Sequence, residues 1–219
     1  MQSLFGKARR RLPTPSPAVA SAAAGSSEAQ EQLLLRQIAA KDHHAFETLY
    51  RQYAPRLYRY FAKLLSQPEL IEEILDDVMI VVWQNAARYD GTAKPSTWIF
   101  GIAHFKALKA RARLNKIPAE PPVHPAEATY ADAPEALLMY DGLRHELRRA
   151  LERLSPEQRA VVELTFHEER SYQEIADIMS CPINTVKTRM WHARQYLKAA
   201  LAELRPMRTP VRPSGTTTE

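Results

Sequence analysis

Apolar side chains recur at helical spacing along two stretches of the chain, and a proline-rich segment separates the two stretches. In the first, residues 29–116, the spacing predicts a series of helices. One of these is apolar on nearly all sides from Val78 to Trp83 and is therefore expected near the centre of its bundle. The second stretch, residues 137–204, opens on a leucine stripe and continues in further helical repeats. The pattern predicts an all-α fold of two small helical domains joined by a flexible linker over residues 117–136.

Short polar patterns predict where helices begin. Ser171 followed three residues later by Glu174 is a capping box, in which each side chain satisfies a free backbone N–H at the start of the helix. Ser66 and Glu69 repeat this pattern. Pro55 lies inside a strong helical repeat, where it is expected to kink the helix or to be absorbed at a cost in free energy.

The segment Ser171–Leu201 carries the clearest functional pattern. Its first predicted helix ends at Ser180-Cys181-Pro182, and proline suits the first turn of the helix that follows. One side of that second helix is apolar. The other side has no Asp or Glu and presents six side chains suited to DNA phosphates and base edges: Asn184, Thr185, Lys187, Thr188, Arg189 and Arg194. This layout is that of a helix-turn-helix whose second helix reads DNA, and a surface helical hairpin with a solvated basic face is the alternative.

Composition narrows the class of protein. The chain has 219 residues, with 30 Lys and Arg against 25 Asp and Glu and a formal charge of +5. This net charge is compatible with a polyanionic partner. Because the acidic residues offset most of the basic ones, only local clusters of Lys and Arg indicate where such a partner would bind. The single cysteine, Cys181, excludes an internal disulfide and a cysteine-rich zinc site, and it fits a reducing cytoplasm. No apolar run approaches the ~18 residues that a membrane helix needs, so membrane insertion is not expected.

Both ends of the chain have the composition of tails. Residues 1–28 contain a basic cluster followed by a Pro/Ala/Ser stretch without a Leu or Ile run, which is unlike a signal peptide. We expect these residues to be disordered. Residues 205–219 are rich in Pro, Thr and Arg and are expected to form a second disordered tail.

Enzyme-like features are weak. His43, His44 and Glu47 could share a helix face, but with no third ligand nearby they are expected to be helix-surface residues rather than a metal site. Cys181 lies beside the start of a helix, where a thiolate would be stabilised, although a plain turn residue is the simpler interpretation. The chain has neither a phosphate-cradling glycine loop nor a nucleophile–base pair, so we expect no catalysis, cofactor or metal.

Several motifs together resemble one family. In the second stretch these are LSPEQRAVVEL, SYQEIADIM and NTVKTRMWHAR; in the first they are AFETLYRQYAPRLYRYF, EILDDVMIVVW and PSTWIFGIA. In this order and separation they are similar to the extracytoplasmic-function group of bacterial RNA polymerase sigma factors, over about residues 33–201. The resemblance implies that the first domain binds core polymerase and melts the minus-ten promoter element. It implies that the second domain reads the minus-thirty-five element as duplex, and that an anti-sigma factor is a possible further partner.

The resemblance assigns roles to specific residues. Glu73, Asp76 and Asp77 lie in the acidic segment that the family presents to core polymerase, although such charges would also suit a solvated helix face. Melting requires bases to leave the stack and phosphates to be neutralised. The residues expected to serve this purpose are Tyr89, Lys106, Lys109, Arg111 and Arg113.

The promoter-reading helix also departs from the family. Gly101 takes the position of the usual Arg, Phe105 that of the usual Asn and Lys109 that of the usual Asp. These changes put an inherited minus-ten sequence preference in doubt, and the role of Phe105 stays open between packing and stacking. Trp98 and Phe100 are expected in the core. The alternative to a sigma factor is an autonomous helix-turn-helix regulator whose first domain is sensory or dimerising.

Overall fold

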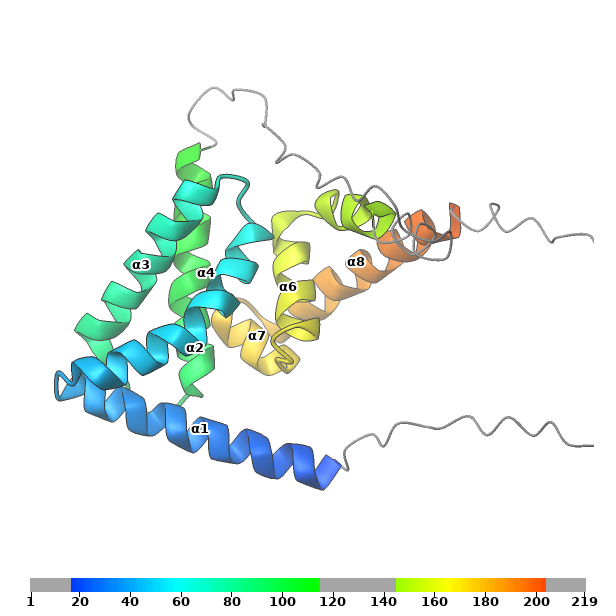
Figure 1. The fold of residues 1–219 in the computed structure, drawn as a ribbon. Helices are drawn as coiled ribbons and strands as arrows, with labels where there is room; N and C mark the ends of the chain where they lie inside the picture. Colours follow the sequence, from blue (N-terminus) through cyan, green and yellow to red (C-terminus); the bar gives the residue numbers. More distant parts are fainter. Residues whose placement is uncertain (1–16, 115–144, 204–219) are drawn as a thin grey trace, which may run out of the picture.

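The structure, a computed structural model, describes residues 17–114 and 145–203, with side chains from residue 27 onward. Within these ranges every regular element is helical, so the all-α prediction is confirmed (Figure 1). Residues 145–152 are helical as well. The named elements are α1 (Pro17–Ala39), α2 (His43–Ala62), α3 (Pro68–Asn85), the 3-10 turn η1 (Ala86–Arg88), α4 (Pro95–Leu114), α6 (Pro156–Phe166), α7 (Tyr172–Ile178) and α8 (Ile183–Glu203).

The first half of the molecule, α1 to α4, packs around the apolar faces of α2 and α3. Side chains that recur every third or fourth residue of α2 meet in the core, where five are fully buried: Leu49, Tyr53, Leu57, Tyr60 and Phe61. In α3, Val78 and Val82 are also fully buried, whereas Ile80 is 51% exposed. The expectation of a central, fully surrounded α3 is therefore wrong for one side of this helix, which the neighbouring helices leave open.

The capping prediction is confirmed at Ser171 and wrong at Ser66. Ser171 and Glu174 form a reciprocal capping box at the start of α7. At α3 the cap is Gln67, which makes no side-chain hydrogen bond to the helix. The reason is Pro68: its fixed φ and missing N–H place it at the first helical position, so the residue directly before it becomes the cap.

Helix α1 begins earlier than the sequence predicts. It starts at Pro17, so residues 17–28, expected to belong to a disordered tail, are helical. These residues are rich in alanine, the best helix former, and they extend a helix whose later turns bury Leu35 and Ile38. The predictions for residues 1–16, for the linker at 117–136 and for the tail at 205–219 lie outside the described residues.

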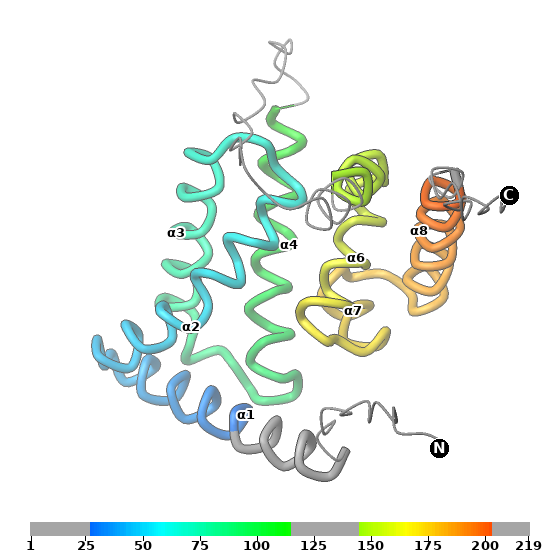
Figure 2. Tube along the Cα trace, turned by 45° about the vertical axis from the view of Figure 1, so that its right-hand side comes forward, coloured from blue at the N-terminus to red at the C-terminus, as the bar shows by residue number. Residues whose placement is uncertain are grey.

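The second half, α6 to α8, lies against the first and does not stand apart from it (Figures 1 and 2). Helix α7 packs along α4, and α6 also contacts α2. One cluster of buried apolar residues runs through both halves. This contact decides where the predicted functional residues lie relative to one another.

Candidate nucleic-acid and protein interface

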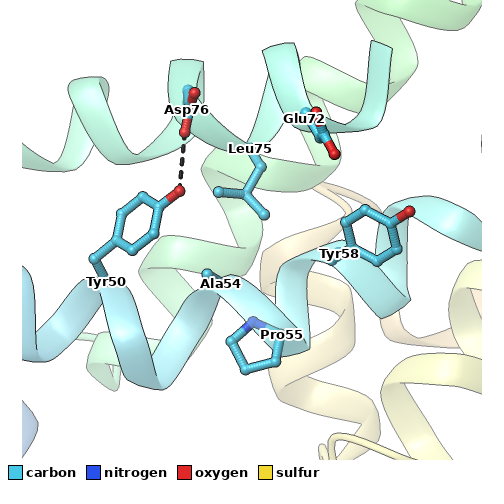
Figure 3. Close-up of a pocket in the computed structure, with 7 residues that line it drawn as sticks. All are labelled: Tyr50, Ala54, Pro55, Tyr58, Glu72, Leu75 and Asp76. Carbon is cyan, nitrogen blue, oxygen red and sulfur yellow. Dashed lines mark hydrogen bonds between the residues drawn. The ribbon is translucent and has the colours of Figure 1, made fainter. Parts of the chain in front are cut away.

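The acidic segment of α3 borders a hollow on the surface of the first half. The hollow lies between α2 and α3 and has a volume of about 430 Å³ (Figure 3). Seven residues line it: Tyr50, Ala54, Pro55, Tyr58, Glu72, Leu75 and Asp76. The Tyr50 hydroxyl donates a hydrogen bond to the Asp76 carboxylate at 3.0 Å, which fixes this carboxylate at the rim. Pro55 lies within α2, and the helix continues past this proline to Ala62.

The other two acidic candidates face α4. The Asp77 carboxylate lies 2.8 Å from the Lys106 ammonium, and Glu73 lies 3.6 Å from the Arg113 guanidinium. Residues predicted to bind polymerase are thus paired with residues predicted to bind DNA. The Glu73–Arg113 pair is well exposed and the Asp77–Lys106 pair partly so, so each stabilises the fold by about 1 kcal/mol or less and can exchange partners.

The remaining candidates on the first half have separate environments. Arg111 pairs with Glu157 of α6 at 3.5 Å. Lys109 is exposed and makes no ion pair with any described residue. The Tyr89 ring packs on Trp98 with 5.4 Å between ring centroids, and its hydroxyl donates to the Ala93 carbonyl, so Tyr89 closes the loop before α4. Burial is complete for Phe100, as expected, and partial for Trp98.

The helix-turn-helix forms as the sequence predicts, with α7 followed by α8. Ile175, Val186 and Met190 are buried between these helices and hold α8 in place. The opposite side of α8 is exposed and carries Asn184, Lys187, Thr188 and Arg194, while Thr185 is half-buried. This face is free to approach DNA.

Arg189 differs from the other five candidates on α8. It is half-buried, and its guanidinium donates a hydrogen bond to the Cys181 sulfur at 3.7 Å. Its charge contributes to lowering the pKa values of His104 on α4 and Glu157 on α6. The Arg189 guanidinium therefore turns towards Cys181 and is less exposed than Asn184, Lys187, Thr188 and Arg194.

A buried cluster of charges joins the two halves. The Glu168 carboxylate, with 2% of its side chain exposed, accepts hydrogen bonds from the Arg56 guanidinium at 3.0 and 2.5 Å. Arg59 lies 3.5 Å from the same carboxylate and 3.6 Å from Glu163. Glu163 also lies 2.9 Å from the His167 ring, and its burial raises the pKa of its carboxyl group above the usual value. Taking a carboxylate out of water is tolerated here because cations of the other half surround it.

A second polar cluster lies at the start of α4. Arg170 donates a hydrogen bond to the Ser96 hydroxyl at 2.7 Å, and Lys94 lies 3.2 Å from Glu174. Several buried polar atoms near this junction have no hydrogen-bond partner among the described residues: Arg159 Nε, Glu163 Oε1, Arg170 Nε and Glu174 Oε1. Of these atoms, Glu163 Oε1 and Glu174 Oε1 still lie within ion-pair distance of Arg59 and Lys94, at 3.6 and 3.2 Å.

Sequence reasoning missed the residues of this junction. Arg56 and Glu168 are 112 positions apart, and nothing in either local pattern indicates the partner of the other. The available signal was weak: Glu163 stands within the apolar run of α6, where a buried carboxylate requires a cation.

His104 provides a test of how tightly the halves pack. Its Nδ1 atom lies 2.7 Å from the buried Tyr60 hydroxyl. Burial, and then the charge of Arg189, lower the pKa of His104 to about 4, with Glu157 opposing the shift. Because this pKa lies below the unfolded value of about 6.5, the stability contribution is full above pH 6.5 and is lost as the pH falls towards 4.

We therefore expect the free energy of unfolding to fall by about 2 kcal/mol when the pH is lowered from 7 to 5, because the folded state resists protonation of His104. Denaturant unfolding at several pH values measures this slope, and His104→Gln should flatten it. The exposed His192 supplies the matched control, since His192→Gln should leave the slope as it is. Equal slopes in wild type and His104→Gln would contradict the burial of this ring.

Two further features bear on chemistry. The part of the chain that the structure describes has no group of three His, Cys, Asp or Glu side chains arranged to hold a metal ion. None of the described helices is both long and apolar enough to cross a membrane.

Comparisons with known proteins agree on one family. Residues 49–117 match the model for sigma-70 region 2, and residues 144–205 match the model for sigma-70 region 4, so together these models match more than half of the chain. An extracytoplasmic-function RNA polymerase sigma factor, SigK of Mycobacterium sp. (strain JLS), is 30% identical over 184 residues, which cover 77% of this chain and 89% of SigK.

Two solved structures share the fold. CnrH in complex with the cytosolic domain of CnrY has a TM-score of 0.56 at 19% identity, covering 80% of this chain and 98% of CnrH. The sigma factor RpoE of Bartonella quintana, in complex with the anti-sigma factor NepR, has a TM-score of 0.53 at 23% identity, covering 72% of this chain and 96% of RpoE.

Proposed function

Since the chain belongs to the extracytoplasmic-function sigma factors of bacterial RNA polymerase, and so directs promoter recognition and transcription initiation, we propose how its two halves divide that work. The first half, residues 29–116, docks on core polymerase and engages the minus-ten element. The second half, residues 137–204, reads the minus-thirty-five element as duplex. The polymerase carries out the catalysis, and the chain acts in the cytoplasm, where the bacterial chromosome lies.

The polymerase contact centres on the hollow between α2 and α3. Asp76 is held at its rim by Tyr50, and Asp77 and Glu73, one turn apart from each other, lie on the side facing α4. Carboxylates beside a hollow that also presents Ala54, Pro55 and Leu75 suit a basic protein partner, because the charges steer its approach while the apolar contacts supply affinity. Lys106 and Arg113 become available to DNA phosphates when Asp77 and Glu73 turn to the polymerase.

Promoter engagement requires the halves to separate. The two promoter elements are roughly 25 base pairs apart, or about 85 Å along B-DNA at 3.4 Å per pair. In the structure Arg189 on α8 instead lies close enough to His104 on α4 to lower its pKa. Residues 115–144, fully extended, reach at most about 100 Å, which is sufficient for the separation. The packed arrangement is that of the chain before it binds polymerase.

The basic outer face of α8, docked on α7, is the observation that carries this proposal. Its test is run-off transcription with purified core polymerase and a genomic promoter library, with the full chain added or omitted. New start sites that depend on the chain, together with its co-purification with core polymerase, are expected. No start sites and no co-purification, combined with specific duplex binding by the chain alone, would support an autonomous regulator instead. Addition of candidate anti-sigma proteins to the same reaction tests for the further partner.

The exposed cations of α8 are expected to act on phosphates. Lys187→Ala and Arg194→Ala should each weaken binding of the holoenzyme to minus-thirty-five duplexes of any sequence. Each should also reduce the slope of log affinity against log salt by about 0.9. Filter binding at several salt concentrations measures both effects. Arg148→Ala, which removes another exposed arginine of the second half, is the matched control and should keep the wild-type slope.

A further inference from the structure

One side of α4 contacts the second half of the molecule near both of its ends. At the start of the helix, Arg170 donates a hydrogen bond to the Ser96 hydroxyl at 2.7 Å. Near the other end, the Arg111 guanidinium lies 3.5 Å from the Glu157 carboxylate on α6. His104 stands between these contacts at helical spacing from both, and only 4% of its surface is exposed. His104 therefore lies on the side of α4 that the second half covers.

Groups from both halves surround the His104 ring. From α2, the fully buried Tyr60 places its hydroxyl 2.7 Å from the Nδ1 atom of His104. From the second half, the charges of Arg189 on α8 and Glu157 on α6 act on the ring in opposite directions. Burial has the largest effect and Arg189 the next, so the pKa of His104 falls to about 4 and the ring is uncharged at neutral pH. The packed arrangement thus favours the neutral form of this histidine.

Charged side chains on the other helices that pack along α4 have partners of their own. These pairs are Glu31 of α1 with Arg56, Asp77 of α3 with Lys106, Glu73 of α3 with Arg113, and Glu174 of α7 with Lys94. Glu157 favours a proton on His104 but is itself paired with Arg111. A protonated ring in the packed form would therefore meet the repelling charge of Arg189 and a carboxylate that is already committed.

Separation of the halves would change this environment. Arg189 and Glu157 would leave with the second half, and water would reach the side of α4 that carries His104. The pKa of an imidazole in water is about 6.5, so the separated form binds the proton more tightly than the packed form does. By linkage, the packed form keeps its full advantage above pH 6.5 and loses it as the pH falls towards 4. Acid therefore favours separation.

We propose that His104 is a pH-sensitive switch at the contact between the halves, whose protonation in acid separates them and releases the chain to bind core polymerase. The proton is the ligand that operates the switch. Full exposure of the ring in the separated form would raise the ratio of separated to packed chains by up to about 20-fold between pH 7 and pH 5. This inference rests on the proposed function, in which the halves separate before the promoter is read.

Glu163 on α6 responds to acid in the opposite direction. Its burial raises the pKa of its carboxyl group, so the packed form holds a proton there more tightly than the separated form does. The cations around it are Arg59 and Lys63 of α2 and, when protonated, His167 of its own half. A comparison of the wild-type chain with a variant that lacks only the His104 imidazole removes this effect, because Glu163 is present in both.

Single-molecule energy transfer counts separated and packed chains directly. The dyes are attached through Gln84→Cys on α3 and Glu152→Cys in the second half, both exposed positions, in a full chain with Cys181→Ser. Between pH 7 and pH 5, the ratio of separated to packed molecules should rise by about threefold to 20-fold. His104→Gln, which stays neutral, should remain packed at both pH values, and His104→Arg, which stays charged, should separate already at pH 7. The exposed His192 supplies the matched control, since His192→Gln should respond as the wild type does.

Three outcomes would overturn the switch. One is a rise of less than about threefold in the wild-type chain. Another is an equal rise in His104→Gln, which would assign the response to a different group. A third is a parallel loss of helix content in circular dichroism, because the chain then unfolds instead of separating. Failure of the proposed function looks different: acid would separate the halves, yet the affinity of the unlabelled chain for core polymerase, relative to that of His104→Gln at the same pH, would not increase.

Discussion

Reversal of Asp76 and Asp77 to lysine is expected to abolish start sites that depend on this chain and to weaken its binding to core polymerase roughly 100-fold or more. The physical reason is electrostatic: each close charge pair across an interface contributes more than about 1.5 kcal/mol, and reversal replaces attraction by repulsion. Asp76 lies at the rim of the hollow between α2 and α3, where the Tyr50 hydroxyl orients it. Titration of labelled chain with core polymerase measures the loss of binding, and run-off transcription measures the loss of start sites.

The design must keep the fold intact, because Asp77 also pairs with Lys106. A lysine at position 77 would repel Lys106 on the neighbouring helix. The double variant Asp77→Lys/Lys106→Asp restores that attraction while it keeps the reversed charge on α3, so polymerase binding should stay weak in a well-folded chain. Glu152→Lys, a reversal at an exposed position of the second half, should bind normally. Normal binding by Asp76→Lys/Asp77→Lys would remove α3 from the polymerase interface.

The parts of this structure that local chemistry determines were predictable from the sequence. The helix-turn-helix follows from a capping box at Ser171 and an apolar stripe on α8, both of which depend on residues a few positions apart. The misplaced start of α3 also has a local cause, since Pro68 competes with Ser66 for the position of the cap. Similarly, the early start of α1 at Pro17 reflects alanine propensity, which a composition-based expectation of disorder underestimates.

Contacts between distant segments were not predictable in the same way. The sequence indicated an acidic α3 and a basic α4, but not that Asp77 would meet Lys106, because that depends on how two antiparallel helices slide along each other. The orientation of Arg189 was not predicted either. Helical periodicity places it beside the DNA-facing residues of α8, whereas its guanidinium turns towards Cys181 in the turn before this helix. Exposure of Phe105, left open by the sequence, likewise depends on which side of α4 the second half covers.

The junction between the halves leads to the second large effect. Glu168→Gln is expected to open the packed arrangement, because it leaves the half-buried Arg56 and the more exposed Arg59 facing a neutral amide in place of a buried carboxylate. Removing one partner of a buried ion pair typically costs about 3–5 kcal/mol. Here that cost falls on the contact between halves, since Arg56 and Glu168 belong to different halves. Small-angle X-ray scattering of the free chain should therefore show a larger radius of gyration, with helix content unchanged in circular dichroism.

Separation of the two halves should also increase the affinity of the chain for core polymerase. A ligand that binds only the separated form has an apparent affinity reduced by the fraction of chain that is open, so a variant that populates this form binds core polymerase more tightly, by up to roughly 100-fold. Glu169→Gln is the matched control: the same substitution at the adjacent, exposed position should change neither size nor affinity. A compact Glu168→Gln chain with wild-type affinity would mean that the charge cluster does not hold the halves together. An expanded chain with weaker polymerase binding would mean instead that the packed form is the one polymerase recognises. Only expansion accompanied by tighter binding agrees with a junction that must separate before the promoter is read.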